Sequence, residues 1–173
     1  MKARGDAARM FAAGALWLVA SSATADVKVP ALIGDHMVLQ QGTTVRLWGT
    51  AAAGEKVSVD VAGTGGKAVA DARGAWEVRF GPVKAGGPHA LTIKGRNTLA
   101  FTDVWFGEVW VASGQSNMEF PLSLARGSDA FLAEGCPKIR LFQVPKNPSL
   151  EAKTDVDGSW TACDANTARA FSA

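Results

Sequence analysis

Apolar and polar residues alternate along much of the first half of the chain, from Val27 to about Asp103. The clearest runs are 57–61, 76–80 and 91–93, where every second residue is apolar. A period of two places the apolar side chains on one face of a β-strand, so each run predicts a strand with one buried face. Turn residues separate the runs and no helical period interrupts them. This pattern favours an N-terminal antiparallel β-sandwich over residues 26–103.

The pattern changes at Val104, where we place the start of a second domain, residues 104–173. The run Val109-Trp110-Val111-Ala112 is continuously apolar, which is typical of a strand buried on both faces in a parallel sheet covered by helices. We expect four further elements: a helix at 128–134, a strand at 138–144, a polar loop at 145–158 and a helix from Ala165 capped by Asp164. This order predicts the start of an α/β domain. The last helix has no terminator before Ala173, so we expect the chain to be a fragment.

The first 25 residues have the features of a signal peptide. Three basic residues precede an apolar run from Met10 to Ala20, and Ala23-Thr24-Ala25 is a small-residue cleavage pattern. The apolar run is shorter than the ~20 residues that span a bilayer. We therefore expect cleavage after Ala25, no membrane span in the mature chain, and a secreted or periplasmic protein. A buried first helix is the alternative.

Removal of this leader makes the remaining chain electrically neutral. The leader carries three of the 18 basic residues and one of the 16 acidic ones, which leaves 15 of each sign. A neutral chain gives no electrostatic reason to expect a nucleic acid partner. Export permits disulfides, and a bridge between Cys136 and Cys163 would close a loop of 26 residues. Two free thiols are an equally simple interpretation, and two cysteines are too few for a metal site of their own. We expect no metal and no cofactor.

Several other residues with possible chemistry have simpler structural interpretations. The glycine-rich segment 63–68 lacks the spacing of a phosphate loop, so we expect a hairpin turn there. Asp103 and Glu108 are expected at solvated strand ends, and His36 and His89 are expected to have structural roles. The tryptophans of the predicted strands are expected to pack in a core, with sugar stacking possible for an exposed one.

Ser116 has two open interpretations. Together with Glu119 it fits a capping box, in which the serine caps a helix and the glutamate bonds back to it. A longer helix that started at Ser116 would have Pro121 at its fifth position, where proline clashes with the preceding turn. The capping box therefore explains at most one short turn. Alternatively, a serine presented after a buried strand and a glycine is typical of a hydrolase nucleophile. The motif is not the usual elbow, because Met118 takes the position of its last glycine.

The sequence "GEVWVASGQSNMEFPL" around Ser116 resembles the nucleophile block of the sialate O-acetylesterase family, a branch of the SGNH hydrolases. The upstream segment "PALIGDHMVLQQG" and the downstream segments "KIRLFQVP" and "GSWTACDANTARAFSA" are also similar to that family. The resemblance implies an α/β hydrolase domain of flavodoxin-like type following the sandwich, and a serine esterase without cofactors. Its substrate would be an O-acetylated carbohydrate, such as a sialic acid or an acetylated plant or bacterial glycan.

Only Ser116 matches a catalytic residue of the resembled family. Gln115 and Asn117 are expected to orient the turn, to contact the oxyanion or substrate, or to be purely structural. The Asp-x-x-His block that carries the base of the family does not occur in these residues, so we expect this chain to be inactive alone. The alternative is a secreted β-sandwich module that binds carbohydrate without catalysis.

Overall fold

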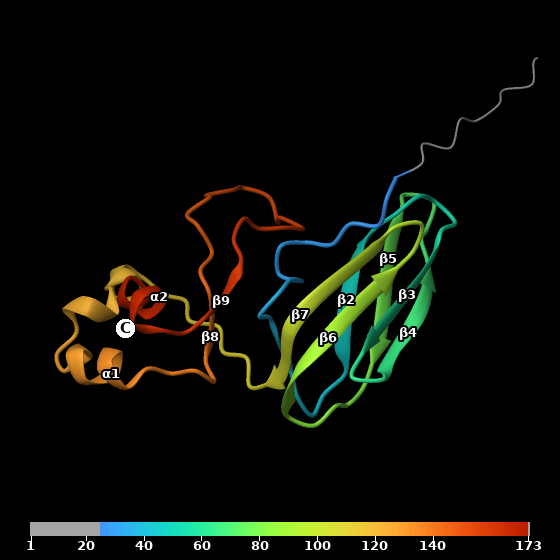
Figure 1. Ribbon diagram of the computed structural model, residues 1–173. Helices are drawn as coiled ribbons and strands as arrows, with labels where there is room; N and C mark the ends of the chain where they lie inside the picture. The colour runs from blue at the N-terminus through green and yellow to red at the C-terminus, as the bar shows by residue number, and fades with distance from the viewer. Residues whose placement is uncertain (1–24, 173) are drawn as a thin grey trace, which may run out of the picture.

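The structure, a computed structural model, describes residues 25–172. The predicted leader, residues 1–25, lies outside the described residues except for Ala25. Two regions follow one another along the chain: a β region, residues 25–107, and a C-terminal region, residues 108–172 (Figure 1). The predicted boundary at 103/104 falls inside the last strand of the β region, which continues to Gly107.

Seven strands form two sheets in the β region. The strands are β1 (Val38–Gln40), β2 (Val45–Thr50), β3 (Lys56–Val61), β4 (Thr64–Val69), β5 (Ala75–Phe80), β6 (Gly86–Lys94) and β7 (Thr98–Gly107). Five strands pair in the order β1-β7-β6-β3-β4, and β2 pairs with β5 in a two-stranded sheet. Neighbours are antiparallel except β1 and β7, which run parallel, a pairing that the alternation did not predict.

The apolar faces of the two sheets bury one common core. In β3 the predicted period is seen directly, because Val57, Val59 and Val61 are buried while Lys56 and Asp60 are exposed. The core contains 17 buried residues, drawn from both sheets and from the loop before β1. Burial of apolar surface contributes about 25 cal/mol per Å², so this core is the main source of stability in the β region.

The glycine-rich segment 63–68 belongs to a hairpin, as predicted. Strands β3 and β4 pair from Val61 and Thr64 onward, which leaves Ala62 and Gly63 as a two-residue turn. Both turn residues have positive φ, 55° and 71°, the backbone pattern of a type I′ hairpin. Glycine adopts this conformation without strain, so its role in this segment is conformational.

The C-terminal region consists of short elements joined by irregular chain. They are the single 3₁₀ turns η1 (Ser116–Glu119) and η2 (Leu122–Leu124), α1 (Ser128–Glu134), β8 (Arg140–Phe142), β9 (Trp160–Ala162) and α2 (Ala165–Arg169). Both predicted helices are present, and Asp164 caps α2 by accepting from the backbone N–H groups of Asn166 and Thr167. The predicted strand at 138–144 is limited to β8, which pairs antiparallel with β9. Within residues 108–172 there is no parallel sheet.

The prediction of a buried strand at 109–112 is wrong for this structure. These residues are irregular and exposed, with Trp110 at 87% and Val111 at 89% exposure. An extended segment becomes a buried strand only when neighbouring strands pair with it and other elements cover its faces. The described residues of the C-terminal region supply no such neighbour, so the apolar run lies open.

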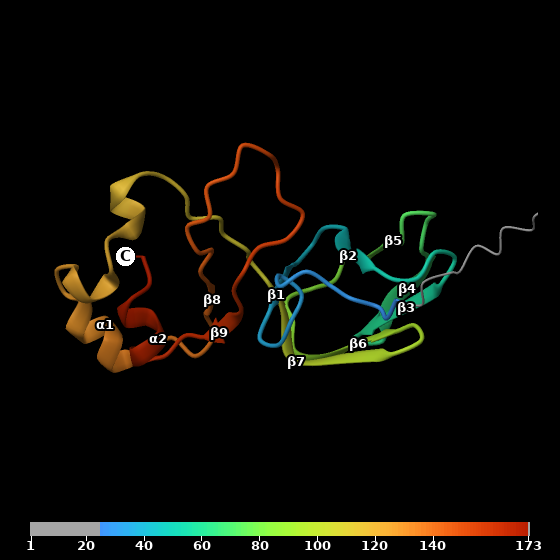
Figure 2. The ribbon, with the colours of Figure 1, turned by 90° about the horizontal axis from the view of Figure 1, so that it is seen from above.

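Strands β8 and β9 lie between the C-terminal helices and the β region. Figure 1 shows them beside β7, and Figure 2, which looks down on the molecule, shows the same order. The side chain of Trp160 in β9 packs against the core of the β region and donates from Nε1 to the carbonyl of Leu32, at 3.0 Å. This short ladder therefore connects the two regions.

Candidate active site around Ser116

Ser116 lies in a single helical turn that the chain reaches after leaving β7. The turn η1 is closed by a bond from Met118 N–H to the Gln115 carbonyl, at 2.8 Å. Its cap position is Gln115, whose backbone is extended and whose side chain makes no capping bond. The capping-box interpretation of Ser116 is therefore wrong, because Ser116 lies inside the turn and not at its cap.

Pro121 limits this turn, as the sequence predicted. The residue after η1, Phe120, is already extended, and so is Pro121 with φ −73° and ψ 143°. The following chain is held by the segment after α2, since Leu122 N–H donates to the Phe171 carbonyl at 2.8 Å. The Ser116 turn is thus short and is fixed on its C-terminal side.

The side chains of Gln115, Ser116 and Asn117 are all exposed. None of the three makes a side-chain hydrogen bond to another described residue. The Ser116 hydroxyl therefore has no structural partner that would explain a serine at this position. An unpaired, accessible hydroxyl is what a nucleophile requires on its substrate side.

Neither histidine reaches Ser116. The Nδ1 atom of His36 bonds to a carboxylate oxygen of Asp103 at 2.7 Å, and His89 packs near Phe106 with ring centroids 5.8 Å apart. Both histidines belong to the β region, where the sequence interpretation gave them structural roles. The described residues therefore leave the Ser116 hydroxyl without a bonded base.

A pocket of about 440 Å³ lies next to the Ser116 turn. Met118 and Glu119 line it from the turn, and the segments 142–146 and 170–172 line it from the other sides. At 2.8 Å, Lys146 Nζ pairs with Glu119 Oε1, and the Ser172 hydroxyl is buried without a hydrogen-bond partner among the described residues. This volume is within the range of small-molecule sites, and the lining combines apolar and polar groups.

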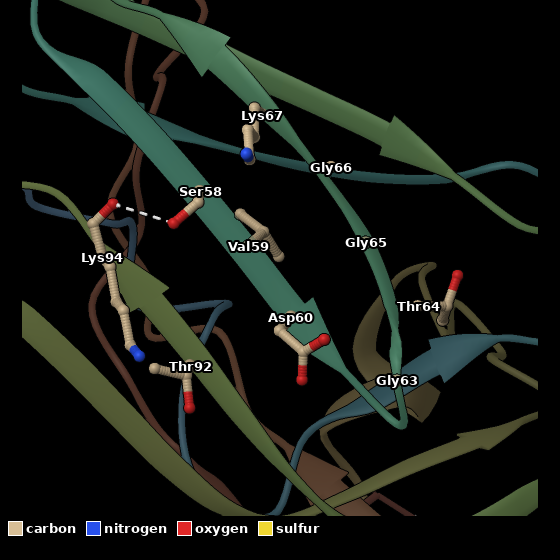
Figure 3. Close-up of a pocket in the computed structure, with 10 residues that line it drawn as sticks. All are labelled: Ser58, Val59, Asp60, Gly63, Thr64, Gly65, Gly66, Lys67, Thr92 and Lys94. Carbon is tan, nitrogen blue, oxygen red and sulfur yellow. Dashed lines mark hydrogen bonds between the residues drawn. The ribbon is translucent and has the colours of Figure 1, made fainter.

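A second hollow of about 420 Å³ lies on the outer face of β3, β4 and β6 (Figure 3). Its wall includes Ser58, Asp60, Lys67, Thr92 and Lys94, and Figure 3 shows these side chains around the glycines that open β4. No aromatic residue lines it. This hollow is the polar outer face of a sheet, and it lacks the aromatic platform that a sugar-stacking site would use.

Asp103 and Glu108 do not form a carboxylate pair. Glu108 accepts from the side-chain amides of Gln40 and Gln41, at 2.9 and 2.7 Å. Asp103 is not a solvated strand end, as the sequence suggested, because His36, Trp105 and Arg140 all donate to it. Burial alone would raise the pKa of Asp103, but these bonds and the charge of Arg140 hold the pKa below its ordinary value.

Cys136 and Cys163 are free thiols that lie close together. Cys163 is buried in a small cluster with Leu132 and Ala168, and Cys136 packs against that cluster. Burial, followed by the neighbouring Cys136, raises the pKa of the Cys163 thiol. The predicted bridge is absent from this structure, and its formation under oxidising conditions stays a prediction.

No group of three or more histidine, cysteine, aspartate or glutamate side chains in residues 25–172 is arranged to hold a metal ion. None of the helices in the same residues is long and apolar enough to cross a membrane.

The fold resembles that of a carbohydrate esterase. A crystal structure of a carbohydrate acetylesterase from Xanthomonas citri superposes with a TM-score of 0.81 at 34% sequence identity, over 84% of this chain and 34% of that chain. No family model matches the chain. The solved structure thus defines the class: the fold is that of one part of an acetylesterase that acts on carbohydrates.

Two curated relatives have the same name. Sialate O-acetylesterase of Rattus norvegicus is 33% identical over 146 residues, which are 75% of this chain and 27% of that protein. Sialate O-acetylesterase of Mus musculus is 31% identical over 161 residues, or 83% of this chain and 30% of that protein. The chain is therefore related to the sialate O-acetylesterases, the family indicated by its serine motif, and it spans less than a third of the length of these relatives.

Arg140 is the residue that the sequence interpretation missed at the junction of the two regions. It lies in the predicted strand at 138–144, where a charged residue is usually expected to face solvent. Its side chain is only 6% exposed. A basic residue within the short apolar run "KIRLF" was the only signal in the sequence, and that signal does not identify its partner.

Proposed function

We propose that this chain carries the nucleophile segment of a carbohydrate O-acetylesterase, with Ser116 as the nucleophile. The observation that carries the proposal is the exposed Ser116 hydroxyl, which has no structural partner, in a turn beside a pocket. The similarity to acetylesterases supports the reaction class. The substrate would be an acetyl ester of a sugar hydroxyl, in a sialic acid or in an acetylated plant or bacterial glycan.

The reaction would follow the usual course of serine ester hydrolysis. The Ser116 hydroxyl oxygen attacks the acetyl carbonyl carbon while a base accepts its proton, and the carbonyl becomes a tetrahedral oxyanion. The Ser116 backbone N–H would donate to that oxyanion, a contact of the kind worth ~2.7–4 kcal/mol. Collapse releases the sugar alcohol and leaves an acetyl-serine, which water then hydrolyses to acetate and free serine.

The base of this reaction is not supplied by His36 or His89, which are engaged in the β region. We therefore propose that residues 1–173 alone hydrolyse acetyl esters no faster than background. Activity would require a longer polypeptide that also contains an Asp-x-x-His block. We also propose that residues 1–25 direct export, so that the protein acts in the periplasm or outside the cell.

The experiment compares Ser116→Ala with a matched control, Ser113→Ala, which removes another exposed hydroxyl from the same irregular segment. In a polypeptide that joins these residues to an Asp-x-x-His block, Ser116→Ala should abolish release of acetate from O-acetylated sialic acid and Ser113→Ala should not. A fluorophosphonate probe should label Ser116 in that polypeptide and leave the 173-residue chain unlabelled. Full activity of Ser116→Ala would overturn the proposal.

Carbohydrate binding by the β region without catalysis has weaker support. Trp76 is in the core, and the hollow of Figure 3 has no aromatic lining. Trp110 is highly exposed, but it lies in the C-terminal region. Titration of the 173-residue chain with an O-acetylated glycan, followed by NMR shifts of β3, β4 and β6, tests this alternative directly.

A further inference from the structure

Asp103 receives hydrogen bonds from both regions of the molecule. Within the β region, His36 Nδ1 and Trp105 Nε1 donate to its carboxylate at 2.7 and 2.6 Å. From the C-terminal region, Arg140 donates through Nη2 at 2.9 Å and through Nε at 3.1 Å. A charged carboxylate with several directed donors is held more strongly than a neutral acceptor would be. Asp103 is therefore an attachment point for the C-terminal region.

Arg140 is held on every side. Its Nη1 donates to the backbone carbonyls of Pro137 and Ile139, at 2.7 and 3.1 Å. Its guanidinium carbon lies over the ring of Trp105, 5.4 Å from the ring centroid. A buried guanidinium whose donors are bonded and whose face is stacked on a ring is fixed in place. Arg140 therefore fixes β8 relative to Asp103.

The Trp105 ring packs against the backbone of residue 87, which leaves room for it only because that residue is glycine. A Cβ atom at Gly87 would lie 2.6 Å from the ring, and Gly87 has a φ of 146°. Any larger residue would displace the ring and with it the surface on which Arg140 lies. The backbone of β6 thus also supports this contact.

A bulge in β7 aims Asp103 outward. Leu91 pairs with Phe101 and His89 pairs with Val104, so β7 has one residue more than β6 over this interval. Asp103 has a φ of 54°. A bulge of this kind redirects one side chain, and a left-handed non-glycine residue persists only where its surroundings fix it.

Asp35 and His36 hold the backbone of β7 next to Asp103. Asp35 accepts from the backbone N–H of Thr102 at 2.6 Å and from its hydroxyl at 3.0 Å, and His36 N–H donates to the Thr102 carbonyl at 3.1 Å. His36 is itself left-handed, with a φ of 64°. These contacts give a physical role to the "DHMVLQQG" segment, for which the proposed hydrolysis has no use.

A second contact between the regions lies nearby. Trp160, in the strand that pairs with β8, bonds to the Leu32 carbonyl, and the Asp155 carboxylate accepts from Ala31 N–H at 2.9 Å. Both contacts involve the loop that precedes His36. The contact at Asp103 is an ion pair between two charged side chains, whereas the second contact joins Trp160 and the Asp155 carboxylate to neutral backbone groups.

We propose that Asp103 is a latch: its ion pair with Arg140, set by the bulge and by Asp35-His36, fixes the orientation of the C-terminal region against the β region. The Ser116 turn follows that orientation, because Leu122, which follows the turn, is bonded to Phe171 in the segment after α2. The latch does not depend on Ser116 being a nucleophile. Its test includes no enzymatic step, so failure of the proposed hydrolysis leaves it unaffected.

Residual dipolar couplings of the backbone amides in the 173-residue chain measure this orientation. In the wild type, amides of β6–β7 and of β8–β9 should fit one alignment tensor. Asp103→Asn keeps the size and tolerates the left-handed backbone but removes the charge. We expect it to abolish the common fit, so that the C-terminal amides require a separate tensor of smaller magnitude while the β-region amides still fit the wild-type fold.

The control is Glu77→Gln, a carboxylate bonded to Arg46 and Arg79 entirely within the β region, which should retain the single tensor. Arg140→Gln is a second variant that leaves β7 intact, and it should behave like Asp103→Asn. If Asp103→Asn unfolds the β region, the couplings of Arg140→Gln test the latch in its place. A folded variant of either kind that keeps the single wild-type tensor overturns the latch.

Discussion

The two regions treat their apolar residues in opposite ways. In the β region 17 buried residues form one core, whereas the cluster of the C-terminal region has three. Of the ten exposed large apolar residues within residues 25–172, nine lie between Val109 and Leu150. Both regions are rich in apolar residues, so the difference lies in arrangement and not in composition.

The physical reason is the pairing that each pattern requires. Strands that alternate apolar and polar residues need one covered face, and two such sheets cover each other. A continuous apolar run needs cover on both faces. In the described residues, the alternating strands of the β region have their apolar faces covered, whereas the continuous apolar run at 109–112 stays in contact with solvent. The β region therefore has a large apolar core of its own, whereas the C-terminal region buries only a small cluster.

The largest expected effect is in the core of the β region. Trp76 is 3% exposed, and its Nε1 donates to the Thr50 carbonyl at 3.2 Å. Trp76→Ala should lower the free energy of unfolding by ~3–5 kcal/mol, because it removes a large buried ring and leaves a cavity. Urea titration followed by far-UV circular dichroism measures this. A loss below about 1 kcal/mol would mean that the two sheets do not share a core.

Acid should weaken the junction between the regions. Hydrogen bonds from His36, Trp105 and Arg140 outweigh burial and hold the pKa of Asp103 below its ordinary 3.8. A carboxylate whose pKa is lowered by folding contributes stability above its ordinary pKa, and the contribution is lost as the pH falls through the lowered value. At pH 7 we expect Asp103→Asn to cost about 2 kcal/mol, between the values for exposed and buried ion pairs.

The pH dependence separates this effect from other causes. The free energies of unfolding of wild type and Asp103→Asn should differ most near pH 7. They should converge as the pH falls from the ordinary value of 3.8 through the lowered pKa of Asp103, where the wild-type carboxylate becomes protonated in the folded state. Urea titrations at a series of pH values measure the free energy of unfolding of both proteins. Subtracting one from the other at each pH removes the contributions of the carboxylates that the two proteins share. Parallel stability curves down to pH 2 would contradict the assignment of this charge to the junction.

The smallest expected effect is at the exposed tryptophan of the C-terminal region. Trp110→Ala should change the free energy of unfolding of the 173-residue chain by no more than about 0.5 kcal/mol, since its side chain is 87% exposed. Trp76→Ala is the matched comparison, with the same chemical change in the other region. A large loss at Trp110 would show that residues 109–112 are covered in solution and would remove the contrast between the regions.

Much of the β region follows from the sequence alone. Period-two runs such as 57–61 and 76–80 define strand faces because neighbouring side chains of a strand point to opposite sides. The turn at Gly63, the cap at Asp164 and the limit set by Pro121 were also predictable, since each depends on the conformational preference of one or two residues. The serine motif indicated the sialate O-acetylesterases, to which most of the chain is also similar.

The tertiary structure decided what depends on distant partners. Asp103 looked like a solvated strand end, yet a bulge in β7 aims it at Arg140, 37 residues further along the chain. Ser116 fitted a capping box by spacing, but the turn begins one residue earlier and leaves its hydroxyl unpaired. The run at 109–112 has the composition of a buried strand and lies open. Local sequence sets backbone preference, whereas burial and ion pairing depend on which distant segments fold against a residue, and that information is absent from any short stretch of the chain.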